Sequence, residues 1–183
     1  MNYPNKKEHK NKTYIEYGNR GMTLESDINS SNKYYLENDI AVIYKKPTPI
    51  KVVKVDYSRT KIQEAFYEIP STTDYNGVYK GKYIDFEAKE TKSKTSFPII
   101  NIHEHQIKHL ERVNKHGGIS FIIIRFTSLN QTYLIFSKDF INYFKENSIK
   151  KSIPLSYIEE KGYLIKDGYN PIVDYLSIVD NII

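Results

Sequence analysis

The pattern of apolar and polar residues predicts a mixed α/β fold. Apolar residues at helical spacing indicate four helices, at residues 24–38, 101–115, 138–147 and 174–182. Alternating or continuous apolar residues indicate six strands, at residues 40–44, 53–57, 65–69, 83–89, 119–126 and 132–136. The run at 119–126 is almost wholly apolar, which is typical of a strand covered on both faces. We therefore expect a central sheet flanked by helices, in a single domain over residues 19–183.

One predicted strand carries its charged residues on a single face. In residues 83–89 the apolar side chains share one face, and the other face holds Tyr83, Asp85, Glu87 and Lys89. Asp74 precedes Glu87 by 13 residues, in a polar turn that also contains the hairpin signal Asn76-Gly77. Two carboxylates can hold a hard divalent cation, and a lysine beside them can stabilise charge on a phosphate. The pattern favours metal-dependent cleavage of a phosphodiester by Asp74, Glu87 and Lys89, with an ordinary solvated ion pair as the alternative.

A glutamine interrupts the apolar face of the helix predicted at residues 101–115. Gln106 shares this face with Leu110, and burying an amide without partners costs about 1–3 kcal/mol. We expect Gln106 either to be hydrogen-bonded to backbone or to meet the shell of a bound metal. His105 and His109, four residues apart on the same helix, could share a zinc ion, but the spacing supplies no third ligand.

The composition adds a basic, cysteine-free character. The 183 residues carry a net charge of +5, which favours a polyanionic partner, nucleic acid first and a membrane surface second. The absence of cysteine excludes disulfides and thiolate metal sites. Residues 1–18 are polar and lysine-rich, which predicts a flexible basic arm. Neither a long apolar run nor a secretion signal is present, so we expect a cytoplasmic protein without a membrane partner.

A basic segment follows the first predicted strand. Pro47 and Pro49 interrupt the strand pattern, and proline cannot donate to a sheet ladder, so the chain must leave the sheet or follow its edge. We interpret residues 45–70 as a projection, with an integral core hairpin as the alternative. Glu25, in the first turn of the first helix, is explained by the helix dipole, and an accessory role at the active site is the alternative.

Several segments together carry a family resemblance: residues 19–25 (NRGMTLE), 46–49 (KPTP), 71–77 (STTDYNG), 83–91 (YIDFEAKET), 94–98 (KTSFP) and 168–169 (GY). In these segments the chain resembles RecU, the Holliday junction resolvase family within the PD-(D/E)xK nuclease superfamily. The resemblance implies a restriction-endonuclease-like mixed sheet flanked by helices, with residues 45–70 as a protruding β stalk near the junction centre. It also implies a Mg²⁺ site formed by Thr72, Asp74, Glu87 and Gln106, with Lys89 stabilising the transition state. A homodimer with two active sites and an interaction with the RecA recombinase are implied as well.

We therefore expect an endonuclease, dependent on Mg²⁺ or Mn²⁺, that resolves Holliday junctions by paired symmetric nicks during recombination and repair. Its DNA contacts are predicted at Arg20, Lys45, Lys46, Lys51, Lys54, Arg59, Lys61, Lys92 and Lys94. Two alternatives stay open: a restriction-type duplex endonuclease with the same site, and a recombination accessory protein that binds and anneals DNA without cutting it.

Overall fold

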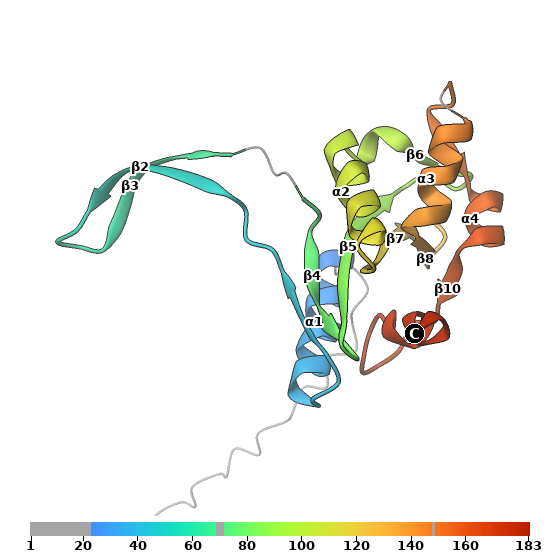
Figure 1. Ribbon diagram of the computed structural model, residues 1–183, viewed down its shortest axis with the longest axis horizontal. Coiled ribbons are helices and arrows are strands. Elements are labelled where there is room, and N and C mark those ends of the chain that lie inside the picture. The colour runs from blue at the N-terminus through green and yellow to red at the C-terminus, as the bar shows by residue number, and fades with distance from the viewer. Residues whose placement is uncertain (1–22, 69–71, 148) are drawn as a thin grey trace, which may run out of the picture.

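A six-stranded mixed sheet forms the centre of the molecule (Figure 1). The structure, a computed structural model, describes residues 23–68, 72–147 and 149–183. The sheet has the order β1-β4-β5-β7-β8-β10, with strands β1 (Val42–Lys45), β4 (Tyr75–Tyr79), β5 (Lys82–Thr91), β7 (Ile119–Phe126), β8 (Gln131–Phe136) and β10 (Tyr163–Ile165). Only β5 and β7 pair in parallel among these neighbours. The prediction of a mixed sheet flanked by helices is confirmed.

Helices cover both faces of this sheet and create two hydrophobic cores. The helices are α1 (Leu24–Glu37), α2 (Glu104–Lys115), α3 (Ser137–Glu146), α4 (Leu155–Lys161) and α5 (Leu176–Val179), with 3₁₀ turns η1 (Ile99–Asn101) and η2 (Asp180–Ile182). One core packs α1 and α5 on the sheet, and the other packs α2, α3 and α4 on the opposite face. Both faces of β7 are therefore buried, as its continuous apolar sequence predicts.

The crossover between the two parallel strands places α2 beside β5. Parallel strands cannot be joined by a tight turn, so the chain must cross over one face of the sheet. The crossover runs through β6 (Ser96–Pro98), η1 and α2. β6 pairs with β9 (Ser152–Pro154) in a small separate sheet. As a result, side chains on α2 meet the face of β5 that carries Glu87 and Lys89.

A two-stranded hairpin projects from the body (Figure 1). β2 (Ile50–Asp56) and β3 (Lys61–Tyr67) pair with each other in a separate antiparallel sheet. None of their residues is buried. This hairpin confirms the predicted projection, although Lys45 still belongs to β1 and Pro70 lies outside the described residues.

The predicted turn at Asn76-Gly77 is wrong. Both residues lie inside β4, and the chain reverses at Lys80 and Gly81, which have positive φ angles of 47° and 74°. Gly77 is needed because its neighbour β1 approaches closely: a Cβ atom at this position would lie 2.1 Å from the carbonyl oxygen of Val42. The dipeptide thus marks close packing between strands rather than a hairpin loop.

Other element boundaries differ more modestly. The strand predicted at residues 65–69 is β3, which begins at Lys61 and ends at Tyr67. The helix predicted from residue 101 begins at Glu104, after η1, and the helix predicted at 174–182 is only the short α5 followed by η2. Besides β4, which was predicted as a turn, the sequence does not predict strands β6, β9 and β10 or helix α4. These three-residue strands and this seven-residue helix are too short to show a period. No helix of the described residues is long and apolar enough to cross a bilayer.

Candidate active site

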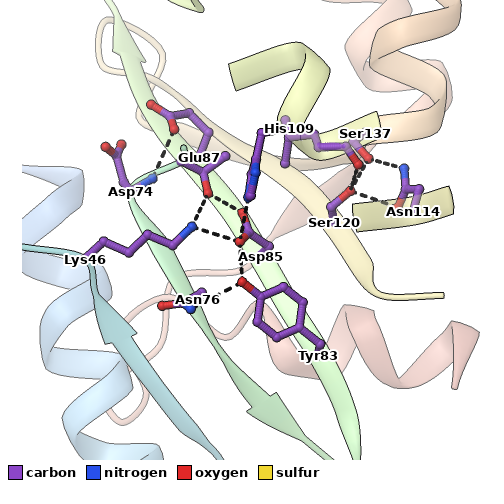
Figure 2. A network of polar contacts seen from close by, with 12 residues as sticks. Lys46, Asp74, Asn76, Tyr83, Asp85, Glu87, His109, Asn114, Ser120 and Ser137 are labelled. Atoms are coloured by element: carbon purple, nitrogen blue, oxygen red, sulfur yellow. Dashed lines mark hydrogen bonds and ion pairs between the residues drawn. The ribbon is translucent and has the colours of Figure 1, made fainter. Parts of the chain in front are cut away.

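The β4–β5 hairpin brings the three predicted catalytic residues together. Asp74 lies directly before β4, and its backbone N–H donates a 3.1 Å hydrogen bond to Glu87 Oε2 on β5. Lys89 Nζ lies 3.8 Å from Asp74 Oδ2 and forms an ion pair with Glu87 Oε1. Figure 2 shows Asp74 and Glu87 side by side, close to the face covered by α2. Alternation along β5 therefore places Glu87 and Lys89 on one face, and the pairing of β4 with β5 brings Asp74 beside them.

Glu87 is held in an unfavourable environment for a carboxylate. Its side chain is fully buried, and Oε1 accepts no hydrogen bond despite its ion pair with Lys89. Burial, with the charge of Asp74 as a second cause, raises the pKa of Glu87 to about 7, although Lys89 opposes the shift. A buried carboxylate beside a second carboxylate, with Lys89 as its one cationic partner in the described residues, is a suitable ligand for a divalent cation.

The ligand set of such a cation must extend beyond acidic side chains. The described residues contain no group of three or more His, Cys, Asp or Glu arranged to hold a metal ion. Hard divalent cations also accept hydroxyl, amide, backbone carbonyl and water oxygens. Asp74 and Glu87 thus fit part of a divalent-metal site. A zinc site made by His105 and His109 gains no support from this arrangement.

Gln106 is buried, as its place on the apolar face predicts, and it has a backbone partner. It lies in the first turn of α2, where Oε1 accepts a 3.0 Å hydrogen bond from the N–H of His103. This contact satisfies one of the free amides at the helix start. Of the two expectations for Gln106, the backbone hydrogen bond is present. A metal contact of Gln106 and of Thr72, a half-buried residue before β4, stays a prediction.

A second buried carboxylate, that of Asp85, lies on the same face of β5. The sequence patterns predicted no role for this residue. Asp85 is fully buried and has four side-chain partners (Figure 2). Its Oδ2 accepts from Lys46 Nζ and from the Tyr83 hydroxyl, both at 2.8 Å, and lies 3.1 Å from His109 Nε2; its Oδ1 accepts from the Thr73 hydroxyl. The alternation that selected Glu87 also placed Asp85 on this face, but three of its partners, Lys46, Thr73 and His109, are 12 or more residues away in the sequence.

The predicted DNA contacts differ in their exposure and in their partners. Exposed residues of the projecting hairpin are Lys51, Lys54, Arg59 and Lys61, and exposed residues after β5 are Lys92 and Lys94. Lys45, at the end of β1, forms a 2.5 Å ion pair with Glu25 in the first turn of α1. Lys46 is largely buried against Asp85, and Arg20 lies outside the described residues. DNA contacts of all these residues, and an accessory role of Glu25, stay predictions.

Comparison with known proteins decides the family. The sequence model of the family described as "Recombination protein U" (RecU) matches residues 19–181. The chain belongs to the RecU family. A RecU protein of Geobacillus sp. strain WCH70, named Holliday junction resolvase RecU, is 56% identical over 171 residues, which cover 91% of this chain and 85% of that protein. The RecU of Geobacillus kaustophilus, with the same name, is 51% identical over 194 residues, covering 100% of this chain and 97% of the relative.

A solved structure shows a weaker likeness to this RecU chain. It is that of Archaeoglobus fulgidus Hjc, a Holliday junction resolvase, with a TM-score of 0.40 and 8% sequence identity; the match covers 73% of this chain and 92% of that one. So slight a likeness has no weight in the assignment. The family rests on sequence, and the resemblance expected from the motifs is confirmed.

Proposed function

We propose that this chain is a Holliday junction resolvase, a divalent-metal-dependent endonuclease that cuts four-way DNA junctions. The observation that carries the proposal is the buried Glu87 carboxylate beside Asp74 and Lys89, in a chain more than half identical to proteins named for this activity. A DNA-binding accessory protein would not need a buried carboxylate with a pKa raised to about 7.

In this proposal Asp74 and Glu87 hold the cation, and Thr72 and Gln106 complete its shell. The ion is Mg²⁺, which Mn²⁺ can replace because both accept oxygen ligands. When bound, it stabilises charge on the scissile phosphate and makes water a better nucleophile.

The protein's own residues perform the rest of the reaction. Glu87 is buried, so its carboxylate has a fixed position and strong interactions with charge nearby. Lys89 is only partly exposed and contacts both acids, so its ammonium stays beside the reacting phosphate, where it stabilises the negative charge that develops in the transition state.

The projecting hairpin is proposed to select branched DNA. Its exposed lysines and arginine bind backbone phosphates, which positions DNA without reading its sequence. A protrusion can enter the open centre of a four-way junction, whereas continuous duplex offers no such opening. Shape therefore gives a selectivity that scattered surface charge cannot.

Two sites are needed for paired nicks on opposite strands, and one chain supplies one site. We therefore include a homodimer in the proposal. An interaction with the RecA recombinase and a cytoplasmic location belong to it as well, and they are supported only by membership of the RecU family.

The test is a nicking assay on a synthetic four-way junction with Mg²⁺, beside linear duplexes of the same arm sequences. We expect symmetric nicks in the junction, intact duplexes, and no cutting by Glu87→Gln. The control is Glu37→Gln, because Glu37 is exposed and its only ion pair in the described residues is with Lys33 at 3.6 Å. Cutting of linear duplex at a fixed sequence would indicate a restriction-type enzyme, and tight junction binding without any cutting would indicate an accessory protein.

A further inference from the structure

We propose that Asp85 is a positioning residue that fastens both ends of the projecting hairpin to the strand carrying Glu87 and Lys89. One buried carboxylate would then set both the direction of the hairpin and the place of Asp74. The part that concerns junction selection rests on the proposed function, and the part that concerns the hairpin does not.

The first argument is the unusual number of partners of Asp85. A buried carboxylate is costly unless it is paired and hydrogen-bonded. Asp85 satisfies this requirement with Lys46, Tyr83 and His109, which Figure 2 shows around it, and with Thr73. Lys46 Nζ also donates a 2.9 Å hydrogen bond to Thr73 Oγ1, so Asp85, Lys46 and Thr73 form a closed triangle.

The second argument is where these partners lie along the chain. Lys46 directly follows β1, at the point where the chain leaves the sheet toward the hairpin. Thr73 lies two residues before β4, at the point where the chain returns. The backbone closes the same base, because the N–H of Lys46 donates a 2.7 Å hydrogen bond to the carbonyl oxygen of Asp74. Asp85 therefore holds the outgoing and the returning chain together on β5.

The third argument is that the hairpin has little else to hold it. No residue of β2 or β3 is buried, and the two strands pair only with each other among the described strands. An isolated two-stranded hairpin is at best marginally stable in water. Its direction must therefore be set at its base, where the contacts of Asp85 are buried.

The same contacts reach the active site. Thr73 precedes Asp74, whose N–H donates to Glu87, and Asp85 is two residues from Glu87 on the same face of β5. A shift of Thr73 would therefore move Asp74 relative to Glu87. A misplacement of about 1 Å can cost about 100-fold in rate. Loosening the base should thus disturb the hairpin and the catalytic acids together.

The experiment measures the hairpin directly, without DNA or metal. The chain contains no cysteine, so Ser58→Cys at the exposed hairpin tip and Ser156→Cys on α4 provide two unique positions for spin labels. Labelled chain is diluted with unlabelled chain, so that the measured distances lie within one molecule. The Asp85→Asn variant is expected to broaden the tip-to-body distance distribution.

A matched control is available on the opposite face of the sheet. Asp27 is also a buried acid, with Arg125 Nη1 2.5 Å from its Oδ2. Asp27→Asn should affect stability yet leave the distance distribution sharp. In the cleavage assay, Asp85→Asn should lower kcat by up to about 100-fold and reduce the preference for junction over duplex, while Asp27→Asn should keep that preference.

Thr73→Val and Lys46→Met provide a second route if Asp85→Asn does not fold. Each removes two of the three contacts of the triangle, and each should broaden the distribution. Folded variants of Asp85, Thr73 or Lys46 that keep a sharp distribution would overturn the inference and leave Asp85 as a group important only for stability. If these variants broaden the distribution but the wild-type chain cuts no junction, the positioning role of Asp85 is supported and the proposed function alone is refuted.

Discussion

Glu87→Gln is expected to stabilise the metal-free protein above neutral pH while it abolishes cleavage. The pKa of Glu87 is raised from 4.5 to about 7 in the folded chain, mainly by burial. Between these values the folded state holds the proton more tightly than the unfolded state, so the free energy of unfolding falls as the pH rises. Above pH 7 the full penalty is present. It amounts to about 3 kcal/mol, at about 1.4 kcal/mol for each tenfold change in the acid constant.

Glutamine has a similar size and no charge, so the variant lacks this penalty. In EDTA at pH 8 its free energy of unfolding should exceed that of the wild type by up to about 3 kcal/mol, or up to roughly 10 °C in Tm for a domain of this size. At pH 4 the difference should largely vanish, because the wild-type carboxyl is then mostly protonated in both states. Added Mg²⁺ should raise the Tm of the wild type and have less effect on the variant.

Thermal melting at the two pH values, with and without metal, checks this reasoning. Glu37→Gln is again the control, since an exposed acid should change Tm little at either pH. A Glu87→Gln protein that is less stable than the wild type in EDTA at pH 8 would refute the argument that burial strains this carboxylate. Normal cleavage by the variant would refute its place in the active site.

Three further outcomes are expected. Lys89→Ala should lower the maximal cleavage rate, measured in single turnover, more than it lowers junction affinity, measured in Ca²⁺. An unchanged maximal rate would mean that this lysine is only a phosphate contact. Replacing residues 50–67 by a short linker should leave a folded core, as seen by thermal melting, but reduce the preference for junction over duplex. The salt dependence of binding should flatten by up to about 0.9 log unit per lost phosphate contact. A folded variant that keeps its full junction preference would contradict the role of the hairpin. Gly77→Ala should destabilise the protein strongly in denaturant melts, because the added Cβ would meet the carbonyl oxygen of Val42. The added Cβ of Gly81→Ala meets nothing within 4 Å, so this control should cost only the strain of a positive φ. Equal effects would contradict the close approach of β1 and β4.

Local sequence patterns were sufficient to predict several features of this protein. The alternation in residues 83–89 placed Asp85, Glu87 and Lys89 on one face, because successive side chains of a strand point to opposite sides. The helical spacing of apolar residues located the helix at residues 24–38, which the structure shows as α1, Leu24–Glu37. The prolines after β1 indicated where the chain leaves the sheet. Each of these features depends on neighbours within a few residues.

Other features depend on residues far apart in the sequence and follow from packing. Asn76-Gly77 has the composition of a turn, yet it forms a strand because β1 packs closely against Gly77. Lys46 is an ordinary basic residue in the sequence, but its side chain is largely withdrawn from water because it pairs with Asp85, 39 residues later, which requires a counter-charge. The raised pKa of Glu87 likewise arises mainly from burial, with the charge of Asp74, 13 residues earlier, as the second cause. Local periodicity determines which face a side chain occupies, whereas packing determines whether that face meets water, a charge or another strand, and no short-range pattern contains that information.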